Sequence, residues 1–154
     1  GKNVYVKIPV MNTKQESTSP IVRELALDGT HLNVTAVFTV RQSYEMCQAL
    51  AGGAPSILSL FAGRLADVGL NPAPFVAAST EIARSFDAKS IEVLWASTRE
   101  AYNIVEAEHL GCAIITAPAD ILKKTRSFGK DPFQMSLETI KTFKTDSDAA
   151  GFSL

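Results

Sequence analysis

Short apolar runs alternate with longer segments of helical periodicity along the whole chain. Five runs are rich in β-branched and aliphatic residues and have the length of buried parallel strands. They are Val4–Val10, Leu32–Phe38, Ser56–Ala62, Ile91–Ala96 and Ala113–Ala117. A regular alternation of strand and helix predicts an α/β fold with a parallel sheet and right-handed crossovers.

The intervening segments carry the signals of helix starts and stops. In Ser19–Leu27, Ser19 is the expected cap, Pro20 takes the first helical position and Gly29 is the expected stop. Thr98 is the expected cap of another helix. The further predicted helices are Val40–Ala51, Pro74–Phe86, Thr98–Leu110 and Ala119–Lys124.

Two architectures share this order of elements, namely a doubly wound sheet and a closed barrel. The sequence contains neither a G-x-G-x-x-G motif nor a P-loop motif. This argues against the nucleotide-binding doubly wound folds, in which such loops hold phosphate groups. The order of elements alone leaves both architectures open.

Composition narrows the class of protein. The 154 residues are 46% hydrophobic and 20% charged with a net charge of -1, which is typical of one globular domain with a core. We therefore expect no nucleic-acid or membrane partner, although a local cationic site for a small anion fits. Cys47 and Cys112 read as small buried hydrophobes in a reducing, cytoplasmic setting. His31 and His109 lack metal-ligand spacing, so no metal is expected.

The C-terminal segment differs from the repeating units. A turn-like stretch from Ser127 to Pro132 precedes a helical stripe of apolar side chains, formed by Phe133, Leu137, Ile140 and Phe143. We predict two parts, 1–126 with the βα units and 127–154 as a tail with an amphipathic helix. The stripe packs either on its own domain or on a neighbouring subunit, and we expect a homo-oligomer.

One lysine lies inside a predicted apolar strand. Strand residues alternate between faces, so Val4, Val6 and Ile8 share one face. Tyr5 and Lys7 share the other face, which in a closed barrel is the interior. Burying an ammonium group is costly, so burial favours the neutral amine, a good nucleophile toward carbonyl carbons. The alternative is an edge strand with a solvated lysine.

Polar side chains recur on later strands with the same alternation. They stand where a buried parallel sheet usually shows Val or Ile, near the carboxyl ends of the strands, where barrel enzymes place their active sites. The pairs that share a side are Asn33 with Thr35, Ser59 with Phe61, and Trp95 with Ser97. The pattern predicts a site at this end of the sheet.

Two arginines follow the strands. Arg64 comes after the third predicted strand and Arg99 after the fourth. Arginine presents a planar fork that suits phosphate oxygens, and loops at this end of a barrel often bind phosphate. Ser97 adds a hydroxyl or backbone donor beside them. The alternative is two ordinary surface arginines.

Five segments, in order from about Val4 to about Lys124, resemble the transaldolase and fructose-6-phosphate aldolase family. The third resembles the family's S-P-F-V-G-R signature, and the fourth resembles its A-S-F-R segment. The segments are Val6–Val10, His31–Thr35, Ser59–Leu65, Ala96–Arg99 and Gly111–Pro118.

The resemblance implies a (β/α)8 barrel and a transaldolase that moves a dihydroxyacetone unit from a ketose phosphate to an aldose phosphate without a cofactor. Lys7 matches the Schiff-base lysine. The matching substrate-binding positions are Asn33, Thr35, Ser59, Phe61, Arg64, Ser97 and Arg99, of which Arg64, Ser97 and Arg99 match the phosphate-binding ones. Phe61 resembles transaldolases, because the aldolase branch typically has Tyr there. Aldolase-like cleavage and a catalytically impaired sugar-phosphate-binding fragment remain alternatives.

The chain also departs from the family pattern. Leu60 replaces the usual Pro, Thr98 replaces Phe, and Trp95 replaces a small residue and is expected to point into the barrel. The family's first three βα units, with an acidic residue on the first strand and an acid/base residue on the third, precede its lysine strand. Only a few residues precede Lys7 here. We therefore expect about five βα units of a partial or truncated barrel, with the acid/base residues missing.

Overall fold

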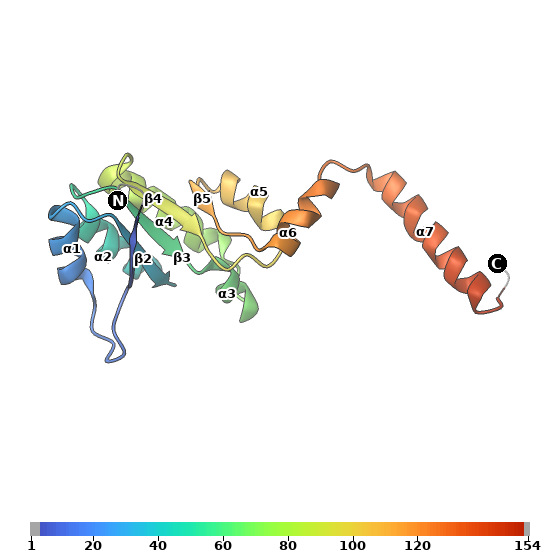
Figure 1. Cartoon of the computed structure of the whole chain (residues 1–154), viewed down its shortest axis with the longest axis horizontal. Coiled ribbons are helices and arrows are strands. Elements are labelled where there is room, and N and C mark those ends of the chain that lie inside the picture. The colour runs from blue at the N-terminus through green and yellow to red at the C-terminus, as the bar shows by residue number, and fades with distance from the viewer. Residues whose placement is uncertain (1–3, 153–154) are drawn as a thin grey trace. The chain divides into compact units, whose positions relative to one another are not determined.

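The structure is a computed structural model and describes residues 4–152. Within them, parallel strands form one sheet in the order β1-β2-β3-β4-β5 (Figure 1). Each predicted strand is present, and each is shorter than predicted. The strands are β1 (Val6–Pro9), β2 (Leu32–Val37), β3 (Ser56–Leu60), β4 (Ile91–Trp95) and β5 (Ile114–Ile115).

The order of the strands separates the two architectures that the sequence leaves open. Every strand pairs in parallel with the strand that follows it in sequence. A doubly wound sheet reverses its strand order at a switch point, whereas a (β/α)8 barrel adds strands consecutively. The chain therefore has a barrel-type α/β fold, of which it contains the five βα units that begin at β1 to β5.

The helices follow the predicted segments closely. Two have the predicted bounds, and a short one that follows β3 directly was not predicted because its first residue, Ala62, was assigned to the strand. The helices are α1 (Ser19–Leu27), α2 (Val40–Leu50), α3 (Ala62–Asp67), α4 (Ala73–Asp87), α5 (Tyr102–His109), α6 (Ala119–Lys124) and α7 (Pro132–Ala149), with a 3-10 turn at Thr125–Ser127.

Two predicted caps are wrong. Thr18, not Ser19, is the N-cap of α1, and among the described residues no side chain caps that end. Thr98 does not start a helix, because its hydroxyl donates instead to the carbonyl oxygen of Thr116 at 2.7 Å. That bond ties the loop after β4 to the loop after β5, and α5 begins only at Tyr102.

Other local signals have the predicted effect. Pro20 lies in the first turn of α1, and Gly29 ends that segment with φ of 84°, a conformation that glycine adopts without strain. The start of α2 is fixed by a capping box between Thr39 and Gln42, in which each side chain accepts a backbone N–H of the other residue.

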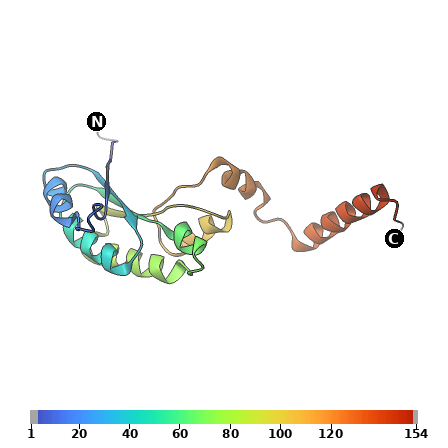
Figure 2. The same cartoon turned by 90° about the horizontal axis from the view of Figure 1, so that it is seen from below.

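The hydrophobic core lies between one face of the sheet and helices α1, α2 and α4, which Figure 2 shows side by side beneath the strands. The opposite face carries a smaller apolar cluster. Its buried members are Ile57, Leu94 and Ala96, with Tyr5, Phe61 and Ile114 packed against them. The helices thus cover one face and leave the other to form a site.

The expected position of Trp95 is wrong. The indole is fully buried in the core on the helix side, while Leu94 and Ala96 belong to the cluster on the opposite face. The prediction counted the alternation back from Ser97, which has φ of 65° and is not extended. Because that residue breaks the alternation, Trp95 points away from the inner face and does not crowd it.

The chain divides into two compact units, of which the first ends at Leu122 and the second begins at Lys123. In the second unit, Asp131 is the N-cap of α7, and its carboxylate accepts the backbone N–H of Gln134 at 3.0 Å. The predicted apolar stripe is present on this helix, and its members Phe133, Leu137, Ile140 and Phe143 are exposed. Across residues 4–152, no helix is both long and apolar enough to cross a membrane.

Candidate functional site

A hollow of about 210 Å³ lies on the inner face of the sheet, the face away from the core helices. It brings together six of the eight residues predicted for the site. The lining residues are Lys7, Asn33, Thr35, Ser59, Phe61, Leu94, Ala96, Ser97 and Thr116. Of the predicted residues, Arg64 and Arg99 lie outside this lining. We call this hollow the inner pocket.

A row of polar side chains crosses the first three strands in the inner pocket. Lys7 on β1 pairs in register with Asn33 on β2. The hydroxyl of Ser59 on β3 donates to the side-chain oxygen of Asn33 at 2.7 Å. This bond fixes the amide, so that its NH2 group remains as a donor beside the lysine.

Lys7 itself is exposed, so the expected burial of its side chain is wrong. The reason is the position of β1 at the edge of the sheet, where its one strand partner among the described residues is β2. Solvent therefore reaches the side chain from the open edge. The lysine nevertheless lines the inner pocket, as the alternation of the strand predicts.

The strand β2 is irregular beside the pocket. Its register shifts between Val34 and Val37, and Ala36 between them has φ of 60°. The bulge lets Val34 and Val37 both stay in the core while Thr35 lines the pocket. The Thr35 hydroxyl is buried and has no hydrogen-bond partner within residues 4–152. It is thus available to bind a ligand or a water molecule.

The first turn of helix α3, which follows β3, touches the loop after β4 beside the pocket. The backbone N–H of Gly63 donates to the carbonyl oxygen of Ala96 at 3.3 Å. A Cβ atom at Gly63 would lie 1.5 Å from the carbonyl oxygen of Ser97, so only glycine permits this approach. Arg64 follows Gly63 directly, and Arg99 follows two residues after Ser97, so this contact holds both arginines near one another.

Both arginines have partners in the structure. The Arg64 guanidinium lies 5.3 Å from the centre of the Phe61 ring, in cation–π geometry. Arg99 forms a two-point ion pair with Asp67, with Nε 2.8 Å from Oδ1 and Nη2 2.6 Å from Oδ2. The Arg99 hydrogen bonds hold the pKa of Asp67 below its ordinary value, and Asp67 in turn raises the pKa of Arg99.

Asp67 was not among the predicted site residues. A signal for it exists in the sequence, because it stands three residues after Arg64 on what proves to be α3, a spacing that places the two side chains on one face of a helix. The prediction did not include that helix, so the spacing carried no information.

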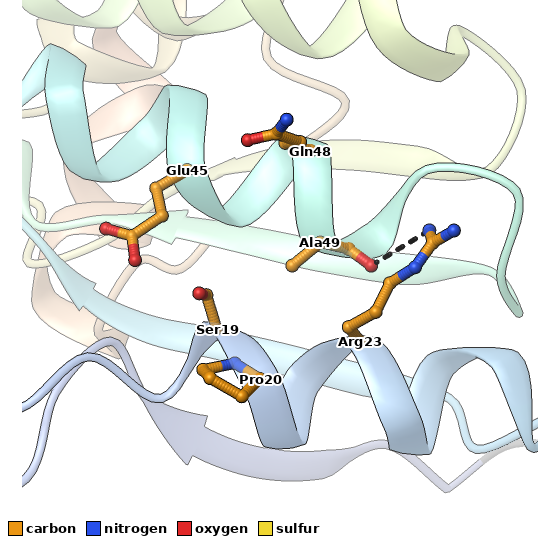
Figure 3. A pocket seen from close by; sticks show the side chains of 6 residues that line it. All are labelled: Ser19, Pro20, Arg23, Glu45, Gln48 and Ala49. Carbon is orange, nitrogen blue, oxygen red and sulfur yellow. Dashed lines mark hydrogen bonds between the residues drawn. The ribbon is translucent and has the colours of Figure 1, made fainter.

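A second hollow lies on the outer side of the domain, between α1 and α2 (Figure 3). Its arginine, Arg23, donates to the carbonyl oxygens of Ala49 and Ala51 at 3.5 and 2.5 Å, and Glu45 accepts from Ser17. Arg23 thereby satisfies carbonyls at the end of α2 that have no partner inside the helix. These polar groups serve the structure, so the inner pocket is the better candidate site.

Neither cysteine is a candidate nucleophile. Burial raises the pKa of the Cys47 thiol to about 12 and that of Cys112 to about 11. Both therefore remain protonated near neutral pH, and the thiol is a poor nucleophile compared with the thiolate. Both are free thiols, buried or half-buried. In the described part of the chain, no group of three His, Cys, Asp or Glu side chains is placed to hold a metal ion.

Comparison with known proteins shows which family the chain belongs to. All of the chain, residues 1–154, matches the family described as transaldolase/fructose-6-phosphate aldolase. The chain belongs to this family. The resemblance seen in the five sequence segments is thereby confirmed. Six of the eight residues predicted for the site line the inner pocket, and Arg64 and Arg99 do not.

Several curated relatives of this family member are named probable transaldolases. One from Methanococcus maripaludis is 36% identical over 126 residues, which cover 80% of this chain and 54% of the relative. One from Caldicellulosiruptor saccharolyticus is 31% identical over 123 residues, covering 80% and 53%. One from Nitrosopumilus maritimus is 28% identical over 151 residues, covering 95% and 64%. The chain thus spans about half the length of the curated relatives it matches.

Proposed function

We propose that the inner pocket carries out transaldolase chemistry, with Lys7 as the amine that forms a Schiff base with a ketose phosphate. The observation that supports this most is the meeting of Lys7 with Asn33, Ser59 and Thr35 in one pocket. A primary amine surrounded by uncharged donors and acceptors suits a carbonyl substrate that carries several hydroxyl groups.

The proposed reaction begins with attack by the Lys7 amine on the ketone carbon, followed by loss of water to give an iminium. The iminium accepts the electron pair of the C3–C4 bond, while the C4 hydroxyl loses its proton and an aldose phosphate departs. The remaining three-carbon enamine then attacks the aldehyde carbon of an acceptor. Hydrolysis of the new iminium releases the product ketose and restores the amine.

The neighbours of Lys7 supply orientation. Asn33 has a fixed amide, because Ser59 donates to its oxygen, and the NH2 group can donate to a substrate hydroxyl. The unpartnered hydroxyl of Thr35 can donate to a second one. Holding the three-carbon unit at two points places its carbonyl carbon against the amine, which lowers the entropic part of the barrier.

Arg64 and Arg99 are the proposed phosphate-binding groups, together with Ser97. The two arginines lie beyond the pocket lining, Arg64 on helix α3 and Arg99 on the loop after β4, on either side of the contact between Gly63 and Ser97. A phosphate at the far end of the sugar would thus be held outside the reacting centre, and its binding energy would position the reacting carbons. The ring of Phe61 makes a cation–π contact with Arg64. Phe at this position resembles transaldolases, which favours transfer over simple cleavage.

A second candidate is a chain that binds sugar phosphates and forms the iminium but turns over slowly. The observation that favours it is the lining of the inner pocket, which within residues 4–152 includes no carboxylate. Loss of a general acid or base typically lowers the rate by about 10²–10⁴-fold. The chain's coverage of about half of its relatives leaves room for such groups outside it.

The test is a transfer assay with fructose 6-phosphate as donor and an aldose phosphate as acceptor. We expect measurable transfer that Lys7→Met lowers at least about a hundredfold, since the variant removes the nucleophile. Lys14→Met is the matched control, because Lys14 is an exposed lysine outside the pocket, and it should leave the rate unchanged.

The same assay separates the alternatives. Release of free dihydroxyacetone in the absence of an acceptor would indicate the aldolase branch. Binding of fructose 6-phosphate without turnover would indicate the second candidate, a chain that binds sugar phosphates but turns over slowly. Transfer that survives Lys7→Met at the wild-type rate would contradict the role of Lys7.

A further inference from the structure

Asp67 ends helix α3 and holds Arg99 side-on. Its two carboxylate oxygens accept from Nε and Nη2 of the guanidinium at 2.8 and 2.6 Å. The residues lie 32 positions apart in sequence, so the pair joins the end of α3 to the loop that follows β4. Such a two-point contact fixes the plane of the guanidinium as well as its position.

The contact leaves part of Arg99 free to bind another anion. A guanidinium has five N–H donors, and Asp67 uses one on Nε and one on Nη2. The remaining donors point along the other edge of the same plane. A second two-point contact, with a phosphate, is therefore compatible with the pair.

The charges around Asp67 also favour binding of an anion. Its carboxylate also interacts electrostatically with Arg64, which lies against the ring of Phe61 at the pocket wall. Two guanidinium groups and one carboxylate leave a net charge of +1, which attracts an anion. The pair is about half exposed, and solvent-exposed ion pairs contribute little to stability. Its contribution is therefore orientation rather than folding energy.

We propose that Asp67 is a positioning residue that aims Arg99 at the phosphate of the substrate and so favours phosphorylated over unphosphorylated sugars. The inference rests on the proposed function, because it assigns the phosphate to Arg64 and Arg99. Its consequence is specific. Loss of the carboxylate weakens binding of the phosphate end of the substrate and leaves the chemistry at Lys7 unaffected.

The first experiment measures steady-state kinetics of Asp67→Asn with fructose 6-phosphate. We expect KM to rise about three- to tenfold with kcat within about twofold, the range in which a two-point surface ion pair acts. With unphosphorylated fructose as donor, kcat/KM should not change. Asp67→Glu, which keeps the carboxylate, should recover part of the loss.

A matched control is Glu100→Gln, which removes a carboxylate next to Arg99 in sequence. Glu100 is exposed and uses its backbone N–H, not its carboxylate, to bond Asn103. An unchanged KM in this control shows that the effect comes from the pair and not from net charge. An unchanged or lowered KM in Asp67→Asn would overturn the proposal, the lowered value because it means that the carboxylate competes with phosphate.

A binding measurement separates this inference from the proposed function. Calorimetric titration of fructose 6-phosphate into Lys7→Met, and into the same variant with Asp67→Asn, reports affinity without covalent chemistry. We expect the second variant to bind about three- to tenfold more weakly. Equal affinities would overturn the role of Asp67 even if Lys7 proves to be the nucleophile. Weaker binding by the second variant would support that role even if Lys7 proves not to be the nucleophile.

Discussion

At the scale of single residues, the contact between Gly63 and Ser97 decides how closely helix α3 approaches the loop after β4. The Gly63 position admits no side chain, since a Cβ atom would lie 1.5 Å from one backbone atom of Ser97 and 2.6 Å from another. Backbone cannot move aside as the end of a flexible side chain can. Ser97, already at φ of 65°, therefore owes its place in the pocket to the absence of that atom.

Gly63→Ala should lower both stability and substrate binding. Helix propensity alone favours alanine in α3 by about 1 kcal/mol, but overpacking against backbone costs about 1–3 kcal/mol, so the free energy of unfolding should fall by up to about 2 kcal/mol. Displacement of Ser97 should weaken fructose 6-phosphate binding in either case. Urea unfolding and calorimetric titration measure the two effects.

The control for this variant is Gly69→Ala. No atom lies within 4 Å of its added Cβ, but its φ of 79° makes the substitution strained. It should cost about 1–2 kcal/mol of unfolding free energy and leave binding unchanged. Wild-type binding by Gly63→Ala would show that helix α3 and the loop after β4 tolerate separation.

Several site residues could be predicted from strand alternation alone. Asn33, Thr35, Ser59 and Phe61 all line the inner pocket, because their strands are extended up to those positions. The alternation gave the wrong face for Trp95. Ser97 has a positive φ, and because this position is not a glycine, the sequence gives no sign of that conformation. Counting alternate residues along a strand cannot predict a backbone conformation that depends on tertiary contacts.

At the scale of elements, two helices could be predicted to the residue from the sequence. Helix α1 follows from its proline and its terminal glycine, and α6 also has its predicted bounds. Helix α3 was missed because it has six residues and no side-chain cap at its start, which is Phe61.

Helix α7 carries an exposed apolar stripe, formed by Phe133, Leu137, Ile140 and Phe143. The described residues of its own unit, from Lys123 to Phe152, leave this stripe uncovered, with Ile140 at 61% and Phe143 at 63% of full exposure. Exposed apolar patches of this kind commonly mark interaction surfaces. We propose that the stripe packs against a second copy of the chain.

Ile140→Asp should convert an oligomer into a monomer, because a carboxylate in an apolar interface is costly to bury. Light scattering after size-exclusion chromatography measures the mass. Thr142→Asp, which adds the same charge outside the stripe, should leave the mass unchanged. A monomeric wild-type chain would contradict the proposal and favour packing of the stripe on its own domain.

At the scale of the whole molecule, the βα order predicted a parallel sheet but not its closure type, since a doubly wound sheet and a barrel share that order. The consecutive strand order identifies the barrel type and places the polar ends of β1, β2 and β3 side by side. The sequence left open whether Lys7 is buried or solvated, because that depends on which strand lies at the edge of the sheet.

The account depends on the covalent chemistry of Lys7 in the inner pocket. Reduction with borohydride in the presence of fructose 6-phosphate, followed by mass spectrometry of the intact chain and its peptides, tests this directly. We predict one added three-carbon unit on the peptide that contains Lys7, and none in Lys7→Met. No added mass on a chain shown to be folded, or an adduct only on a lysine outside the inner pocket, would contradict the account.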